Sequence, residues 1–149
     1  MEQIGSVIKA IETKYAGYKF RSRLEARWAV FFDQAGIKYE YEPEGFDFSD
    51  YPNIDQYLRP DDRRYLPDFW LPTLNCYLEI KPMLNPVDDV AIVKAYLLSQ
   101  KHEVLIVFGQ PGHNSYRVVN CRTGEEMPAF WRPISQINRA YTAARSARF

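Results

Sequence analysis

Three charged side chains near the middle of the chain have the types and spacing of a catalytic group. Asp68, Glu79 and Lys81 lie in two apolar, aromatic segments that are joined by a short turn beginning with a proline. If this hairpin turns directly after Thr73, Asp68 faces Glu79, and Lys81 lies two residues further along on the same face. That register gathers apolar side chains on the opposite face, where burial would hold it in place: Phe69, Leu71, Leu78 and Ile80.

The expected neighbourhood of the two carboxylates limits what they can do. Like charges directly opposite each other destabilise a sheet, so a cation must offset them or one of them must take up a proton. Mg²⁺ prefers carboxylate oxygens together with water and phosphate oxygens. A bound metal ion activates water and stabilises negative charge at phosphorus, and Lys81 could orient or deprotonate that water or neutralise the developing charge. The residues therefore predict metal-assisted hydrolysis of a phosphate ester.

The elements that must position these residues follow from the periodicity of the apolar side chains. Residues 22–35 are expected to form a helix, with Ser22 as N-cap and Gly36 as its stop. Residues 47–64 read as a long loop, and 4–13 as either a short helix or a strand. The other expected strands are 37–42, 65–71, 76–81, 104–108 and 116–120, and the other expected helices are 87–100 and 134–147.

This order of elements indicates an α/β or α+β domain with a single mixed β-sheet flanked by helices. The 149 residues are enough for one domain with its own core. The two cysteines, Cys76 and Cys121, stand alone, which excludes a disulfide scaffold and a zinc finger. We find no transmembrane stretch or secretory signal, so we expect a cytoplasmic protein without membrane association.

The net charge is zero, which argues against a purely electrostatic nucleic-acid binder. The charge is nevertheless uneven along the chain. Residues 14–27 and 132–149 each carry a net charge of +4, whereas 28–131 carry −7. The basic C-terminal end, about 135–149, is expected to be either the terminal helix or a flexible basic tail.

The order of the charged residues resembles a known family. Pro67-Asp68, ten intervening residues and Glu79-Ile80-Lys81 resemble the motif of the PD-(D/E)xK nuclease superfamily. An acidic residue on a preceding helix often completes the site in that superfamily, and Glu25 matches that position. The order is similar to that of small phage and bacterial nucleases, including junction resolvases and transposon end-cutting endonucleases.

The resemblance implies a restriction-endonuclease-like fold and a metal-dependent DNA endonuclease that leaves a 5′-phosphate. Asp68 and Glu79 would bind Mg²⁺, with Mn²⁺ as substitute, helped by the backbone carbonyl of Ile80. Glu25 would bind the metal directly or through water, and Lys81 would be the catalytic lysine. The small size suggests that DNA structure, or recruitment by a protein partner, directs cleavage. A homodimer would place two sites on two strands.

Basic side chains near the expected site are candidates for phosphate contacts, which position nucleic acid without reading its sequence. Four of them surround Glu25 and one lies on the helix after the second strand: Lys19, Arg21, Arg23, Arg27 and Lys94. Trp70, on the predicted face of Asp68, would either stack on a base or pack against a helix.

Two alternatives remain open. Ser22-Arg23-Leu24-Glu25 is a capping box, in which Glu25 would return to the backbone N–H of Ser22 instead of, or in addition to, serving the site. The whole domain could also be a non-catalytic module that binds nucleic acid or protein and uses its carboxylates structurally. If it is a nuclease, the residues do not distinguish DNA from RNA as substrate.

Overall fold

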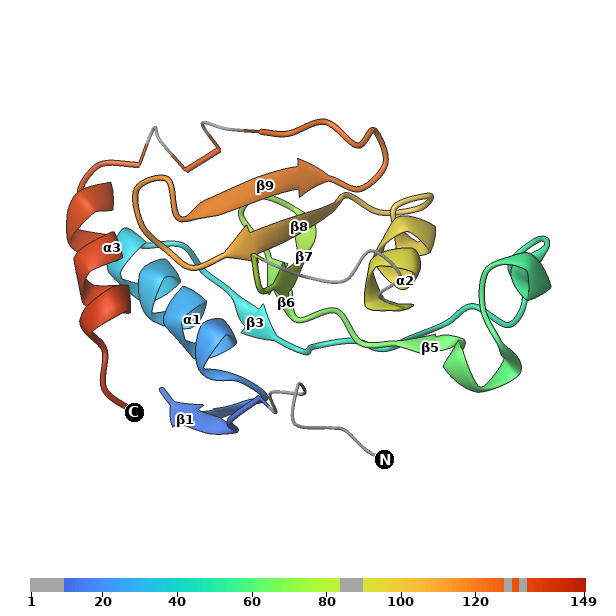
Figure 1. Cartoon of the computed structure of the whole chain (residues 1–149), viewed down its shortest axis with the longest axis horizontal. Helices are drawn as coiled ribbons and strands as arrows, with labels where there is room; N and C mark the ends of the chain where they lie inside the picture. Colours follow the sequence, from blue (N-terminus) through green and yellow to red (C-terminus); the bar gives the residue numbers. More distant parts are fainter. Residues whose placement is uncertain (1–9, 84–89, 128–129, 132–133) are drawn as a thin grey trace, which may run out of the picture.

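The computed structural model describes residues 10–83, 90–127, 130–131 and 134–149. The fold is mixed α+β, with a five-stranded mixed sheet and three helices in the described residues (Figure 1). The expected element at 4–13 falls mostly outside the described residues, as do positions 87–89 of the expected helix 87–100.

Helix α1, Arg23–Ala35, confirms the first predicted helix. Ser22 is extended, and its side chain accepts a hydrogen bond from the backbone N–H of Glu25 at 3.1 Å, which caps the first turn. Gly36 ends the helix in the left-handed conformation, with φ of 74°, where an L side chain would be strained. The predicted N-cap at Ser22 and the predicted end at Gly36 are therefore both confirmed.

The sheet runs in the order β3-β6-β7-β8-β9. Its strands are β3 (Glu40–Tyr41), β6 (Phe69–Leu71), β7 (Cys76–Lys81), β8 (Val104–Gly109) and β9 (Tyr116–Asn120). Strands β7 and β8 are parallel, and the other neighbours are antiparallel. In the β6–β7 hairpin Phe69 pairs with Leu78 and Leu71 with Cys76, which confirms the register predicted from the alternation of apolar residues.

Two predicted strands are shorter than expected. The segment 65–71 divides into β5 (Arg64–Tyr65) and β6, which belong to different sheets, because Pro67 has no N–H to continue a ladder. Of the predicted strand 37–42 only β3 forms. Its partner β6 ends at Leu71 before another proline, and the backbone turns at Glu42, where φ is 47°.

The segment expected as a loop, 47–64, contains regular structure. Strand β4 (Phe46–Asp47) pairs with β5, and two short 3₁₀ turns lie between them, η1 (Ile54–Gln56) and η2 (Pro60–Asp62). Burial of apolar side chains in an otherwise polar stretch explains this order, since Phe48, Ile54 and Leu58 are nearly inaccessible to solvent.

Four further elements complete the fold. A hairpin of β1 (Thr13–Tyr15) and β2 (Tyr18–Phe20) turns through Ala16 and Gly17, both at positive φ, and sequence reasoning did not assign it. Helix α2 (Val90–Leu98) follows β7 and helix α3 (Ile137–Ser146) lies near the C-terminus. Thus the chain from 137 to 146 forms the expected terminal helix, and it packs along α1 (Figure 1).

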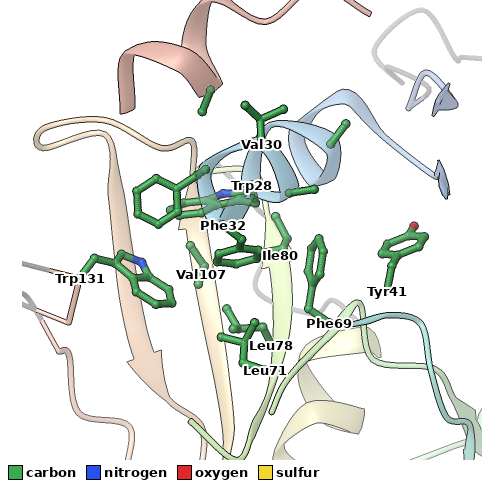
Figure 2. Close-up of a cluster of buried hydrophobic side chains, with 14 of the residues drawn as sticks. Trp28, Val30, Phe32, Tyr41, Phe69, Leu71, Leu78, Ile80, Val107 and Trp131 are labelled. Atoms are coloured by element: carbon green, nitrogen blue, oxygen red, sulfur yellow. The ribbon is translucent and has the colours of Figure 1, made fainter. Parts of the chain in front are cut away.

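The sheet is covered on both faces by apolar clusters. Figure 2 shows Trp28 and Phe32 of α1 above Phe69, Leu78 and Ile80 of the sheet. The second cluster, on the opposite face, combines side chains of α2 with those of the 46–65 segment and with Tyr77 and Ile106. The face that carries Asp68 and Glu79 is therefore covered as well, which the hairpin pattern alone did not indicate.

None of the helices in the described parts of the chain is long and apolar enough to cross a membrane.

Candidate active site

Asp68 lies in the link between β5 and β6, where the ladder is interrupted. Its carboxylate accepts a hydrogen bond from the backbone N–H of Ile80 in β7 at 2.7 Å, and its own carbonyl accepts one from Glu42 at 2.9 Å. The residue is 6% exposed. The break that Pro67 causes therefore fixes a buried carboxylate directly against β7.

Glu79 lies in β7 on the face that does not join the α1 cluster, and it is 5% exposed. The hydroxyl of Tyr65 donates to its Oε1 at 2.6 Å. The ammonium of Lys81 lies 3.7 Å from its Oε2. Alternation along β7 thus places Lys81 beside Glu79, as the sequence predicts.

Glu25 reaches the same region from the first turn of α1. Its Oε1 accepts hydrogen bonds from the hydroxyl of Tyr41 at 2.7 Å and from the backbone N–H of Arg21 at 3.1 Å. The capping-box prediction is therefore right for Ser22 but wrong in its return bond, because Glu25 binds the N–H one residue earlier than expected. The helix start lies at the site, so capping and proximity to the other carboxylates coexist.

The carboxyl groups perturb one another. Burial raises the pKa of Asp68 well above its ordinary value, and the charges of Glu79 and Glu25 raise it further. Burial also raises the pKa of Glu25, against hydrogen bonds from Tyr41 and Asp68 that lower it. A cation bound among these groups would offset the charges that crowd Asp68.

This donor set is suited to a hard cation. Carboxylate oxygens crowded at low exposure attract Mg²⁺ or Mn²⁺, whose charge would offset theirs. As the side chains stand, no group of three or more His, Cys, Asp or Glu residues within the described ranges is arranged to hold a metal ion. Ile80 contributes its N–H to Asp68, and a metal bond to its carbonyl stays a prediction.

The predicted phosphate contacts fall into two groups. Lys19 and Arg23 are exposed, and Lys19 lies 3.5 Å from Glu12 in a solvent-exposed ion pair. The other three side chains bind other groups of the protein. Arg21 pairs with Glu42 at 2.5 Å, Arg27 donates to the carbonyls of Ala144 and Arg145 at the end of α3, and Lys94 donates to the carbonyl of Arg64 at 2.7 Å.

Trp70 packs rather than standing free. Its ring lies 4.6 Å from that of Tyr77, centroid to centroid, at the margin of the second cluster. The structure therefore displays packing, but against a ring of strand β7 and not against a helix as expected.

Sequence reasoning missed two site residues, Tyr41 and Tyr65. Both hydroxyl groups end on site carboxylates, although Tyr65 is 14 positions from Glu79 and Tyr41 is 16 from Glu25. The available signal was their place in segments that precede or adjoin the acidic residues. The pairing itself depends on tertiary folding.

A groove of about 490 Å³ lies beside the first turns of α1, and none of the four candidate site residues lines it. It is lined by Leu24 and Arg27 of α1, by Pro82 and Met83 after β7, and by Gln110 beyond β8. Leu24 and Pro82 precede Glu25 and follow Lys81 in the chain, but the groove gives no access to the carboxylates themselves.

No family model, curated protein or solved structure matches this chain.

Proposed function

We propose that the protein is a metal-dependent DNA endonuclease with its active site at Asp68, Glu79, Lys81 and Glu25. One observation supports this most strongly. Three buried carboxyl groups from α1, the β5–β6 link and β7 are close enough to raise the pKa of Asp68, and a lysine lies beside them. Such crowding costs stability, and perturbed carboxyl groups of this kind gather at functional sites.

The residues divide the work as follows. Asp68, Glu79 and Glu25 would hold Mg²⁺, with the carbonyl of Ile80 as a further ligand. The bound ion would supply an activated water and stabilise charge on the phosphate. Lys81, 3.7 Å from Oε2 of Glu79, would orient that water or neutralise the negative charge that develops on the phosphate oxygens. The product would be a nicked or cut strand with a 5′-phosphate.

Three of the five predicted phosphate-binding side chains, Arg21, Arg27 and Lys94, are held by other groups of the protein. A structured DNA, a second copy of the chain or a recruiting protein partner would therefore contribute to recognition.

A cleavage assay tests this proposal. The substrates are supercoiled plasmid, linear duplex, single strands and branched DNA, in Mg²⁺, Mn²⁺ or EDTA. We expect Lys81→Ala to slow metal-dependent cutting by about 10²-fold or more, because a positioned acid–base or electrostatic group contributes at least that much. Lys38→Ala, an exposed lysine on the loop before β3, is the matched control and should cut like the wild type.

Well-folded wild-type protein that cuts no substrate and is not stabilised by Mn²⁺ would overturn the proposal. That result would favour the alternative, a non-catalytic binding module. The engaged state of Arg21, Arg27 and Lys94 fits a protein partner for such a module better than a nucleic acid.

A further inference from the structure

Two tyrosines, both largely buried, approach the candidate site from outside the group of acidic residues. Tyr65 is 5% exposed and Tyr41 is 9% exposed. Each hydroxyl donates to Oε1 of a different site glutamate, Tyr65 to Glu79 and Tyr41 to Glu25. Each of these two glutamates therefore accepts a hydrogen bond from a tyrosine, and the two tyrosines belong to different strands.

The bond from Tyr65 sets the orientation of Glu79. A hydroxyl 2.6 Å from Oε1 fixes the rotation of the carboxylate about its last torsion. Oε2 is then the oxygen on the side of Lys81, at 3.7 Å. Burial raises the pKa of Tyr65 well above its ordinary value, and the charge of Glu79 adds to this, so the hydroxyl remains a donor.

The bond from Tyr41 does the same for Glu25, with additional support from the backbone. The N–H of Arg21 donates both to Oε1 of Glu25 at 3.1 Å and to the hydroxyl of Tyr41 at 3.0 Å. The three groups form a closed arrangement at the start of α1. A long, flexible glutamate is thereby held at the site end of the helix.

We propose that Tyr65 and Tyr41 are positioning residues that hold Glu79 and Glu25 in the orientation that binds the metal ion. This inference rests on the proposed function. Partners that orient metal-binding carboxylates matter almost as much as the ligands, and their loss commonly lowers metal affinity or activity about 10- to 100-fold.

A third tyrosine provides the control. Tyr77 is 5% exposed, and its hydroxyl donates to Oε1 of Glu44 at 2.9 Å. It belongs to the same buried cluster as Tyr65, but Glu44 is not one of the site carboxylates. Tyr77→Phe therefore removes the same kind of bond without touching the site.

The test compares Tyr65→Phe, Tyr41→Phe and Tyr77→Phe in the full chain. Mn²⁺ binding is measured by thermal shift, and single-turnover cleavage is followed across metal concentration. We expect the two site variants to require about 10- to 100-fold more metal ion, both for binding and for cleavage. Tyr77→Phe should leave both metal profiles unchanged.

The outcomes separate this inference from the proposed function. If both site variants cut at the wild-type rate and need no more metal ion than the wild type, the positioning role is wrong but the proposed nuclease activity is not affected. Equal shifts in Tyr77→Phe overturn it too, because the effect is then general to the fold. If the wild type binds Mn²⁺ but cuts no substrate, the nuclease proposal is wrong, and the Mn²⁺ titration of the variants still tests the positioning role of Tyr65 and Tyr41. A wild type that neither binds Mn²⁺ nor cuts overturns both. If Tyr65→Phe does not fold, Tyr41→Phe decides.

Discussion

Asp68 shows most clearly that the site is built at the expense of stability. Its carboxylate accepts a hydrogen bond from the N–H of Ile80, while burial and the charges of Glu79 and Glu25 raise its pKa. A carboxyl whose pKa is higher in the folded than in the unfolded chain binds its proton more tightly when folded. Stability therefore falls as the pH rises above the unfolded value.

Asp68→Asn should accordingly stabilise the protein in EDTA at neutral pH. The amide oxygen can still accept from Ile80, but the buried charge is gone. We expect the melting temperature to rise by a few degrees at about pH 8 and the difference to shrink towards about pH 5. Thermal unfolding across this range measures it, with the exposed Asp61→Asn as control. A variant that is less stable than wild type throughout would contradict the argument.

The sequence allowed some residues of the candidate site to be predicted but not others. The grouping of Asp68, Glu79 and Lys81 could be predicted, because period-two alternation and a short turn determine which side chains share a face. Tyr41 and Tyr65 could not be predicted, since their contacts cross between elements whose relative placement no local pattern specifies. The hydroxyl groups of Tyr41 and Tyr65 reach Glu25 and Glu79 only because of tertiary packing.

At the scale of elements, strong local signals succeeded and weak ones failed. Helix α1 has a capping serine, a terminal glycine and an apolar stripe, and it forms as predicted. The segment 65–71 has strand-forming residues throughout, yet Pro67 splits it, and that split is what frees the Asp68 carboxylate to bind β7. The failure of the strand prediction and the formation of the site thus have one cause.

The contact between α1 and α3 yields an element-scale prediction. Arg27 donates to the carbonyls of Ala144 at 2.8 Å and Arg145 at 2.9 Å, which satisfies the C-terminal end of α3. Arg27→Ala should lower the free energy of unfolding by about 1–2 kcal/mol, since these bonds use a charged donor at a partly exposed position. Urea denaturation measures this loss.

Arg23→Ala is the control on the same helix. Arg23 is exposed at the first turn, so its loss should change stability by less than about 0.5 kcal/mol. Equal destabilisation by both variants would show that Arg27 does not hold α3. If Arg27 served DNA alone, its substitution would weaken binding without changing the urea midpoint.

At the scale of the whole molecule, the uneven charge of the chain and the folded structure must be considered together. The basic N-terminal segment, 14–27, looks like a phosphate-binding surface in the sequence. In the fold, Arg21 is held by Glu42 and Arg27 by the end of α3, while Lys94 binds the carbonyl of Arg64. Folding thus engages three of the five basic side chains that the sequence predicts for phosphate contact.

If the chain binds DNA, as proposed, the salt dependence of that binding should reflect this. Lys19, Arg21 and Arg23 are the exposed members of the predicted set, but Arg21 is held by Glu42 at 2.5 Å, whereas the Lys19–Glu12 pair at 3.5 Å is weak enough to exchange for a phosphate. Two neutralised phosphates give a slope of log affinity against log salt of about −2, whereas five would give about −4.5. Fluorescence anisotropy with Ca²⁺ in place of Mg²⁺, on the substrate that is cut best, measures the slope.

Two substitutions make this last prediction specific. Arg23→Ala should reduce the magnitude of the slope by about one, because one phosphate contact is lost. Arg27→Ala should leave the slope unchanged while it destabilises the fold. A wild-type slope near −4.5, or a reduced slope in Arg27→Ala, would mean that DNA displaces the internal partners of these side chains. Weak, salt-insensitive binding would instead place recognition in a partner protein or a second copy of the chain, because two phosphate contacts cannot by themselves hold a scissile bond at the Asp68 site.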